Sequence, residues 1–387
     1  MKVILLSNTA AYLRNMWLPL ARALRERGAD VVLAAPVDTD VGALVGDGFR
    51  FEPVPLPRGI RWPWNEIKAF VRIVSLYRRE RPDVVHHFTA KPIVYGSLAA
   101  KVTRVPLRIC TVSGLGYLFA KSGRMAKLVQ RLTLRLYRLV LQGRDSWAIF
   151  QNPEDRDLFL RQGVVRPDRA SVVRSSGVDT DAFPLCRLPT GVPVVLCAAR
   201  LIWDKGIGEF VEAAKGLRAK GVAARFLLAG WHDVEHPGAI PETTIRTWHD
   251  QGVIEYLGHC SDMVAVLNRC TVVVLPSKYR EGVPRILVEA ASTGRPVVAT
   301  DVPGCREICL DGFNGKLVKP GDAGGLAAAI AELLADPVDA ERLGRNGRKL
   351  AEEAFDLRRV VSETVTFYTT ATATLSRDLG AVMQPSP

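Results

Sequence analysis

The sequence predicts an α/β protein with two doubly wound domains, each built around a parallel β-sheet. Short runs of Val, Ile and Leu alternate with helical stretches along the chain, and the alternation restarts after residue 190. Continuous apolar strands separated by helices are typical of parallel sheets covered on both faces. The length of 387 residues and the hydrophobic content of 48% exceed what one ordinary core accommodates, which also favours two domains.

The expected strands are short apolar runs that end in polar residues or turns. In the first half we expect them at 3–8, 31–36, 83–88, 107–112 and 146–152. In the second half we expect them at 192–200, 224–230, 254–258, 272–277 and 295–301. Helical patterns are expected around 15–27 and from about 339 to 370.

The segment 175–193 is rich in Pro, Gly and Asp and separates the two series of strands. We therefore expect an N-terminal domain at 1–180, a C-terminal domain at 181–360, and a C-terminal helix and tail at 361–387. Open α/β sheets bind ligands beyond the carboxyl ends of their strands, so a ligand site is expected at those ends, between the domains.

Cysteine usage and hydropathy restrict the class of protein. The seven cysteines are odd in number and form no CxxC pair, which argues against a disulfide framework and a zinc cluster. The start, MKVILLSN, lacks an apolar stretch of signal-peptide length, and no uncharged apolar run reaches the roughly 18 residues of a membrane span. These features predict a cytoplasmic protein without a membrane span or a visible export signal.

The net charge of +12 is concentrated in the first half of the chain. Residues 1–190 hold 30 Lys and Arg against 16 Asp and Glu, or +14, whereas residues 191–387 hold 22 against 24, or −2. This asymmetry indicates attraction to a polyanion, either nucleic acid or an anionic membrane surface. A merely solvated basic surface is the alternative.

A predicted anion site follows the strand at 272–277. Pro284 is typical of a helix start, so the free N–H groups near Arg285 and Ile286 lie at a helix N-terminus, where phosphate binds favourably. Gly282 lets a ligand approach the backbone closely. The stretch therefore predicts a phosphate site.

Carboxylates and cations surround this predicted phosphate site. Glu281 and Glu289 stand on either side of the helix start, and carboxylates accept hydrogen bonds from paired hydroxyls. Phosphate flanked by polyols describes a nucleotide sugar, although both glutamates could instead only favour the helix dipole. Arg200 and Lys205 follow another strand and suit a diphosphate.

These motifs resemble the retaining, GT-B-fold glycosyltransferases of family 4. The matching stretches are ARLIWDKG (199–206), REGVPRILVEAASTGRPVVATDVPGCREI (280–308) and SGVDTDAF (176–183). Within that family, the chain is similar to bacterial enzymes that extend polyprenyl-diphosphate-linked sugars, such as the N-acetylgalactosaminyltransferase of the bacterial N-glycan pathway. That likeness rests on NTAAYLRN (8–15), HHFTAKPIVYGSLAA (86–100) and SGLGYLFA (113–120).

The resemblance implies two Rossmann-like domains that face each other across a cleft, with a C-terminal helix crossing back. It implies transfer of a hexose or N-acetylhexosamine from a UDP-sugar to an undecaprenyl-diphosphate-linked saccharide in bacterial glycan assembly. Such an enzyme would be peripheral on the inner face of the cell membrane. The family retains anomeric configuration without an established protein nucleophile, so none is assigned.

The resemblance also implies a role for each donor-site residue. Arg200 and Lys205 would bind the donor diphosphate and stabilise the leaving nucleotide. Glu281 would hold hydroxyls of the transferred sugar, and Glu289 those of the ribose. Phosphate would contact backbone N–H groups of the segment that comprises Gly282, Val283, Arg285 and Ile286.

The resemblance is less complete on the acceptor side. Relatives often carry an H-x-H motif where this chain has His86 and Phe88, and a Gly-rich loop where it has the glycine-free NTAAYLRN. His86 is a candidate for polar contact with donor sugar or acceptor, and a histidine satisfied by packing is the alternative. Asn15 and Lys91 are candidate contacts to the acceptor diphosphate or sugar.

Two DTD triplets could be mistaken for the metal-binding DxD motif of another glycosyltransferase fold. Asp38 and Asp40 begin a loop after an early strand, and Asp179 and Asp181 lie in the interdomain segment. Capping and turn roles suit these positions. We expect no required metal and no cofactor.

A basic amphipathic helix is predicted at 121–144, with seven basic residues and no acidic ones. One apolar stripe comprises Met125, Leu128, Val129, Leu132, Leu136, Leu139 and Val140, and a second edge comprises Leu134, Tyr137 and Leu141. One apolar face can pack on the domain while the remainder contacts lipid. Tryptophans 62 and 64 beside arginines 58 and 61 also suit a membrane interface, and an unbound basic helix is the alternative.

Other functions remain as alternatives. A nucleotide-sugar epimerase of the same fold would leave the basic amphipathic segment unexplained. A Rossmann dehydrogenase is disfavoured, because Gly114-Leu115-Gly116 has no third glycine at Phe119. A nucleic-acid-binding protein is disfavoured, because the basic residues alternate with aliphatic ones and no recognised binding motif is present.

Overall fold

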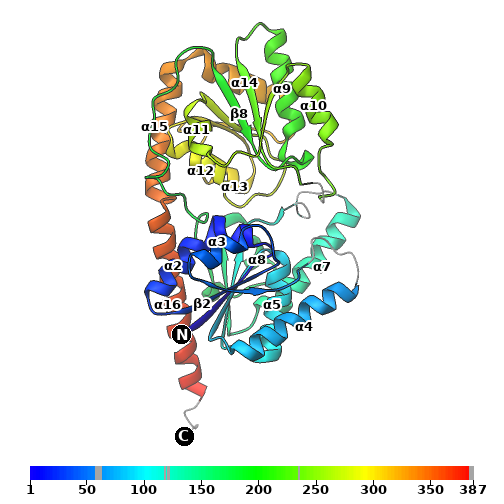
Figure 1. The fold of residues 1–387 in the computed structure, drawn as a ribbon, viewed down its shortest axis with the longest axis vertical. Coiled ribbons are helices and arrows are strands. Elements are labelled where there is room, and N and C mark those ends of the chain that lie inside the picture. The colour runs from blue at the N-terminus through cyan, green and yellow to red at the C-terminus, as the bar shows by residue number, and fades with distance from the viewer. Residues whose placement is uncertain (57–62, 117–118, 120–122, 234–235, 383–387) are drawn as a thin grey trace. The chain divides into compact units, whose positions relative to one another are not determined.

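The computed structural model describes residues 1–56, 63–116, 119, 123–233 and 236–382. The chain forms two compact units (Figure 1). The first unit comprises Met1–Ser113, Ser122–Ser176 and Arg358–Pro387, and the second comprises Gly114–Lys121 and Gly177–Leu357. Each unit contains one all-parallel sheet, so the predicted fold class is confirmed.

The sheet of the first unit has seven strands in the order β3-β2-β1-β4-β5-β6-β7. The strands are β1 Lys2–Leu6, β2 Asp30–Ala35, β3 Arg50–Pro53, β4 Val84–Phe88, β5 Leu107–Val112, β6 Ser146–Phe150 and β7 Ala170–Val172. The central strands are buried on both faces, because the helices that connect parallel strands cover both sides.

The helices of the first unit form two layers on this sheet. They are α1 Ala10–Tyr12, the π-helical turn η1 Leu13–Trp17, α2 Leu18–Glu26, α3 Val41–Gly46, α4 Pro63–Glu80, α5 Ala90–Thr103, α7 Arg124–Leu141, α8 Pro153–Arg161, the short 3₁₀ turn η2 Pro167–Arg169 and α16 Leu357–Val382. Val3 and Leu5 pack with α2 and α16, whereas Ile4 and Leu6 pack with α4 and α5. This alternation follows from the two-residue period of a strand.

The second unit has six strands in the order β10-β9-β8-β11-β12-β13. They are β8 Val194–Ala198, β9 Arg225–Ala229, β10 Glu255–Gly258, β11 Val272–Leu275, β12 Val297–Thr300 and β13 Gly315–Val318. Its helices are η3 Trp203–Lys205, α9 Ile207–Ala219, α10 Glu242–Asp250, α11 Met263–Asn268, α12 Arg285–Ser292, α13 Pro303–Arg306, α14 Ala323–Ala335 and α15 Pro337–Ala354.

In both sheets the strand order reverses next to the first strand. The reversal lies between β1 and β4 in the first unit and between β8 and β11 in the second. Open α/β sheets bind ligands beyond the carboxyl ends of the strands at this switch point. The loops after these four strands are therefore where functional residues are expected.

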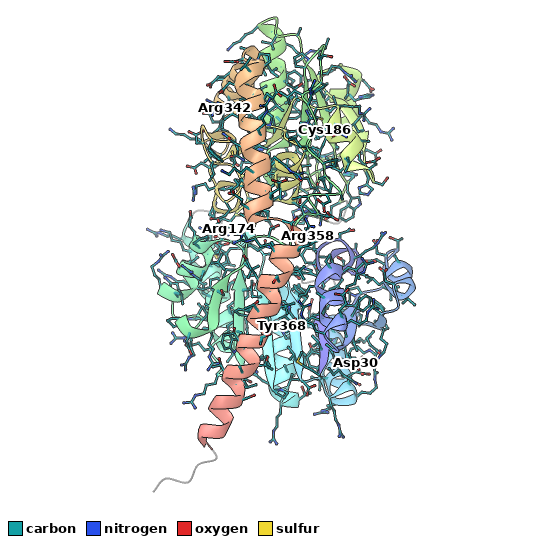
Figure 2. All side chains as sticks on the ribbon, turned by 90° about the vertical axis from the view of Figure 1, so that its left-hand side faces the viewer. Asp30, Arg174, Cys186, Arg342, Arg358 and Tyr368 are labelled. Carbon is teal, nitrogen blue, oxygen red and sulfur yellow. The ribbon has the colours of Figure 1, made fainter. Side chains whose placement is uncertain are left out.

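The helix predicted from 339 to 370 is in fact two helices. The helix α15 ends at Ala354, and α16 begins at Leu357. The break accommodates the buried ring of Phe355 and the carboxylate of Asp356, which accepts a hydrogen bond from the Thr180 hydroxyl at 2.7 Å. The chain thereby returns to the first unit, where α16 packs with Tyr368 against β4 (Figure 2).

Candidate active site

The loop after β8 carries Arg200 and Lys205 towards the loop after β11. Lys205 ends the short helix η3, and Gly206 follows with a left-handed φ of 74°. A Cβ atom on Gly206 would overlap the carbonyl oxygen of Pro276, which directly follows β11. Glycine at this position therefore permits the close approach that brings Lys205 to the second loop.

Lys205 and Glu281 form a direct ion pair at the switch point. The Lys205 ammonium donates a hydrogen bond to Oε1 of Glu281, and the Ser277 hydroxyl donates to the same oxygen at 2.7 Å. The Lys205 Nζ atom also lies 5.3 Å from the centre of the Tyr279 ring. Glu281 is 8% exposed, so this carboxylate is held in one orientation by two donors.

The peptide between Glu281 and Gly282 is enclosed by two other glycines. A Cβ atom on Gly114, whose φ is 88°, would overlap the nitrogen of Gly282. A Cβ atom on Gly304, at the start of α13, would overlap the carbonyl oxygen of Gly282. The segment from Gly114 belongs to the second unit, and Gly116 N–H donates to the carbonyl of Arg280 at 3.1 Å. Two backbone contacts thus fix the loop that presents Glu281.

The helix α12 begins at Arg285, directly after Pro284 at the N-cap position. The N–H groups of its first turn have no intrahelical acceptor and carry the positive end of the helix dipole. Arg285 Nε donates to Oε1 of Glu289 at 2.7 Å. Glu289 is 9% exposed, and burial raises the pKa of its carboxyl although Arg285 opposes the shift.

Arg200 lies beside an acidic side chain that was not predicted from the sequence. Its Nη1 atom is 3.8 Å from Oδ2 of Asp233, whose side chain is buried. Asp233 follows β9, so the two residues come from neighbouring strands of the sheet. The pair leaves Arg200 partly exposed, at 40% of its side chain, and able to contact a ligand.

Asn15 and Lys91 lie in the helical segments that follow β1 and β4, the two switch-point strands of the first unit. Asn15 is exposed on η1, whose Leu13 and Trp17 are buried, and Lys91 lies in the first turn of α5. The Lys91 ammonium donates to both carboxylate oxygens of Glu66, at 2.8 and 3.0 Å. Thr89 has a φ of 70°, a backbone conformation that a β-branched residue rarely adopts, and its buried hydroxyl has no hydrogen-bond partner among the described residues.

His86 does not present a free nitrogen to a substrate. Its ring is fully buried, with Nδ1 2.7 Å from the Tyr368 hydroxyl and Nε2 2.7 Å from the Thr111 hydroxyl. Burial, and then the neighbouring His87, hold the pKa of His86 well below its usual value. This arrangement favours the alternative of a histidine satisfied by packing, and contact of His86 with donor sugar or acceptor stays a prediction.

The predicted capping roles of the two DTD triplets are confirmed. Asp38 Oδ2 accepts the backbone N–H groups of Ala10 and Ala11, at 2.8 and 3.0 Å. Asp179 Oδ1 accepts the N–H groups of Asp181 and Ala182, at 3.0 and 3.2 Å. Within the part of the chain that the structure describes, no group of three or more His, Cys, Asp or Glu side chains is arranged to hold a metal ion.

The predicted basic helix is α7, and its two apolar edges differ in burial. Tyr137 and Leu141 of the second edge are buried, whereas nearly all of the longer stripe faces outward, with Met125 73% exposed. Val140 is the buried exception in that stripe. None of the helices described here is both long and apolar enough to cross a membrane.

Trp64 extends this exposed apolar character to a second helix. It is 72% exposed in the first turn of α4, whereas Arg58, Arg61 and Trp62 lie outside the described residues. The helices α4 and α7 both pack beside α5. The first unit therefore exposes apolar and basic side chains on one helical layer.

Two parallel-sheet α/β units, of seven and six strands, form the GT-B fold of glycosyltransferases. The family models agree, because "Glycosyl transferase 4-like" matches residues 2–145 and "Glycosyl transferases group 1" matches residues 192–336. The chain belongs to the glycosyltransferases.

Curated relatives and solved structures extend over most of the chain. The N,N′-diacetylbacillosaminyl-diphospho-undecaprenol alpha-1,3-N-acetylgalactosaminyltransferase of Campylobacter jejuni is 29% identical over 87% of this chain and 90% of its own. The capsular polysaccharide biosynthesis glycosyltransferase CapM of Staphylococcus aureus is 26% identical over 82% and 84%. The structure of Anabaena HepE in complex with UDP has a TM-score of 0.76, at 19% identity over 96% and 100%.

Proposed function

We propose that this chain is a retaining glycosyltransferase that moves a hexose or N-acetylhexosamine from a UDP-sugar to an undecaprenyl-diphosphate-linked saccharide. The observation that carries the proposal is the ion pair of Lys205 with Glu281 just before the start of α12, with Arg200 on the same loop as Lys205. Two cations on one loop and a helix dipole suit a diphosphate, and the carboxylates of Glu281 and Glu289 suit its sugar and ribose hydroxyls.

In this proposal Lys205 and Arg200 stabilise the diphosphate as the bond to the sugar breaks. Negative charge grows on the leaving nucleotide, and fixed cations in a partly buried site stabilise it without reorganisation of solvent. The diphosphate competes with Glu281 for Lys205, so Glu281 is released to accept hydrogen bonds from the sugar while Ser277 keeps its orientation. Glu289 accepts the ribose hydroxyls four residues into α12.

The acceptor and donor classes rest on similarity. The relative from Campylobacter jejuni is named for a diphospho-undecaprenol-linked acceptor and for N-acetylgalactosamine transfer. The HepE structure is described as a complex with UDP. Asn15 and Lys91, at the switch point of the first unit, are the proposed contacts to the acceptor diphosphate or sugar.

A lipid-linked acceptor requires the enzyme to reach a membrane surface. The helix α7 exposes a leucine-rich stripe flanked by Arg131, Arg135 and Arg138. Apolar side chains that enter the headgroup boundary and arginines that contact anionic lipids together give peripheral association. We assign this surface to the inner face of the cell membrane.

A panel of UDP-, GDP- and TDP-sugars tests the donor assignment. UDP-sugars should protect the protein from thermal unfolding and be hydrolysed slowly in an enzyme-dependent way. Glu289→Ala should lose this protection, because the ribose contact is removed. If Glu289→Ala binds the donor as the wild type does, the ribose assignment is wrong.

A further inference from the structure

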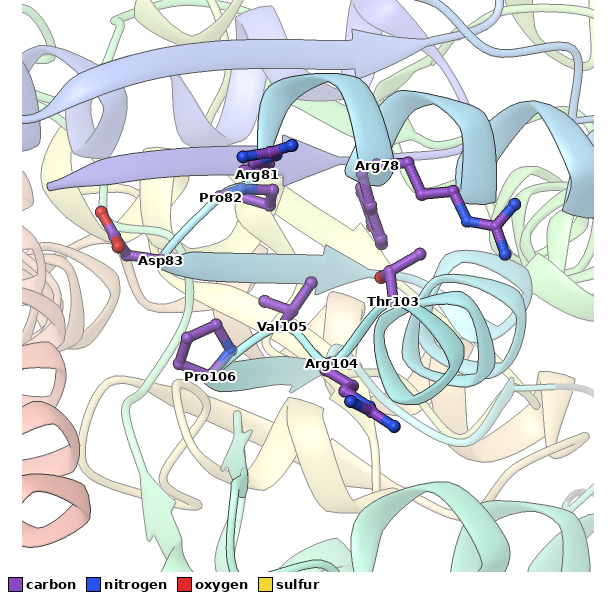
Figure 3. A pocket seen from close by; sticks show the side chains of 9 residues that line it. Arg78, Arg81, Pro82, Asp83, Thr103, Arg104, Val105 and Pro106 are labelled. Carbon is purple, nitrogen blue, oxygen red and sulfur yellow. The ribbon is translucent and has the colours of Figure 1, made fainter. Parts of the chain in front are cut away.

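An arginine-lined cavity lies at the amino edge of the sheet in the first unit, opposite the edge that carries Asn15 and Lys91. Its volume is about 510 Å³, and it lies where α4 and α5 turn into β4 and β5 (Figure 3). These strands are parallel neighbours, so the two turns that precede them lie side by side. Each turn places an arginine in the left-handed region, Arg81 with φ 46° and Arg104 with φ 58°.

The cavity carries an excess of unpaired positive charge. Arg78 in the last turn of α4 joins Arg81 and Arg104 in its lining. None of these three side chains has an ion-pair or hydrogen-bond partner among the residues that the structure describes. The single lining carboxylate, Asp83, already accepts the backbone N–H of Lys2 at 2.7 Å.

Helix capping does not account for these arginines. Basic side chains near a helix C-terminus often donate to the last free carbonyls. Here the backbone N–H groups of Arg81 and Val105 satisfy Tyr77 O and Ala100 O, each at 2.9 Å. The Thr103 hydroxyl donates to the carbonyl of Ala99 at 2.8 Å. The guanidinium groups are therefore available for a ligand.

We propose that this cavity binds a phosphate group, either as a free phosphate compound or as the headgroup of an anionic phospholipid. Guanidinium groups bind phosphate oxygens bidentately, and the exposed side chains of Arg78, Arg81 and Arg104 all start from this concavity, with their guanidinium groups pointing apart (Figure 3). The volume exceeds that of phosphate alone and leaves room for a substituent. The proposal does not depend on glycosyl transfer.

The headgroup source is supported by the neighbourhood of the cavity. Val102, in the last turn of α5 next to the lining residues, is exposed. The Lys101 ammonium donates to the carbonyl of Leu139 and so ties this edge to α7. Leu139 is 57% exposed within the apolar stripe of α7. A phosphate bound here would lie beside the proposed membrane-facing layer.

The test compares a cavity variant with a charge-matched control, both carrying Arg200→Ala and Lys205→Ala so that the proposed donor site contributes no phosphate binding. The cavity variant is Arg78→Gln, Arg81→Gly and Arg104→Gly, in which glycine suits the left-handed φ and keeps the turns intact. The control is Arg342→Gln, Arg345→Gln and Lys349→Gln on the exposed face of α15. Thermal unfolding in buffer without phosphate verifies that both variants fold.

Calorimetric titration with inorganic phosphate should show binding to the control protein and a loss of about tenfold or more in the cavity variant. No binding to the control, or equal affinity in both proteins, would overturn the proposal. Co-sedimentation with phosphatidylcholine vesicles that contain phosphatidic acid then distinguishes the source. Weaker vesicle binding by the cavity variant than by the control supports the headgroup, and equal vesicle binding supports a free phosphate compound.

Discussion

Lys205 and Glu281 form a hydrogen-bonded ion pair at the point where the strand order of the second sheet reverses. The side chains are 13% and 10% exposed, so removal of one partner leaves the other charge largely buried. Lys205 and Glu281 are 76 positions apart in the sequence. The close approach of Gly206 to Pro276 brings their side chains together. The pair is the structural centre of the proposed donor site.

Lys205→Ala should reduce turnover with a UDP-sugar by about 10²–10³-fold, because a preorganised cation at the leaving group is lost. The same variant should lower the free energy of unfolding by about 2 kcal/mol, since Glu281 stays buried without its cation. Adding Glu281→Gln should restore stability but not turnover. Urea unfolding and donor hydrolysis measure the two effects, with Lys215→Ala on the surface of α9 as the control. A double variant as unstable as Lys205→Ala would contradict this account.

Glu289→Gln should abolish donor binding without lowering stability at neutral pH. Burial raises the pKa of Glu289 in the folded state, so the unfolded chain loses this proton first as pH rises. Wild-type stability therefore falls from about pH 4.5 upwards until the folded carboxyl has ionised. Glutamine does not ionise, so the variant does not undergo this loss of stability. The free energy of unfolding of the variant, relative to that of the wild type, should therefore be higher at pH 8 than at pH 4.5. A lower relative stability of the variant at pH 8 would contradict the assigned burial cost.

Gly114→Ala should lower donor turnover through the loop that carries Glu281. The added methyl group would overlap Gly282, and the left-handed φ of 88° adds a backbone cost of about 1 kcal/mol. Gly221→Ala is the matched control, because its φ is 77° in the same unit and no atom lies within 4 Å of its Cβ position. Turnover per folded molecule should fall only for Gly114→Ala. Equal turnover in both variants would mean that Gly114 does not position the Glu281 loop.

Replacement of Arg131, Arg135 and Arg138 by Gln should weaken binding to anionic vesicles. Each basic residue near an anionic surface contributes roughly 1 kcal/mol, so the triple variant should lose about two orders of magnitude in partitioning at low salt. Arg342→Gln, Arg345→Gln and Lys349→Gln removes the same charge from α15. Co-sedimentation unchanged by the α7 variant, or reduced equally by both, would refute a role for α7.

Acidification should destabilise the first unit through its buried histidines. Burial, and then the charge of Arg108, lower the pKa of His87 to about 3, and burial lowers that of His86 as well. Between pH 6.5 and about 3 the unfolded chain binds protons that the folded chain does not, so stability falls as pH falls. The expected loss in this range is about 1.4 kcal/mol per pH unit for His87. His87→Gln should reduce the slope of the free energy of unfolding against pH by one proton, and an unchanged slope would contradict this assignment.

The core of the fold was predictable because buried parallel strands form continuous apolar runs. All ten predicted strands are present, whereas β3, β7 and β13 were not predicted. These three lie at the edges of their sheets and contain few fully buried residues, so their sequences, such as RFEP in β3, carry no apolar signal. The prediction of one continuous helix from 339 to 370 was wrong. The helix is interrupted at Asp356, which accepts a hydrogen bond from Thr180, a residue distant in sequence.

The residues of the candidate site that lie in one sequence motif were predictable, whereas those brought to the site by tertiary contacts were not. Glu281, Gly282 and α12 come from one strand-loop-helix segment. Ser277 was also predictable from the sequence, because it is the polar residue that ends the apolar run four residues before Glu281. No sequence pattern marked Asp233 or Gly304. Only the folded chain brings Asp233 beside Arg200 and Gly304 beside Gly282.

Histidine 86 and the helix α7 show where the sequence left two outcomes open. A histidine at a strand end gives the same sequence pattern whether it binds a substrate or a buried tyrosine. The partner of His86, Tyr368, lies 282 positions away in the sequence. The two apolar edges of α7 were both able to face the domain. The aromatic contact of Tyr137 with Phe159, at 5.3 Å between ring centres, accompanies burial of the shorter edge.

Transfer of radiolabelled sugar from a UDP-sugar to an undecaprenyl-diphosphate-linked saccharide tests the central claim most directly. The wild-type protein, mixed with acceptor in anionic vesicles and a panel of UDP-hexoses and UDP-N-acetylhexosamines, should move label into the lipid fraction for at least one donor. The new linkage should keep the anomeric configuration of the donor, and Lys205→Ala should transfer little. Conversion of the UDP-sugar to an epimer without label in the lipid fraction would contradict the claim.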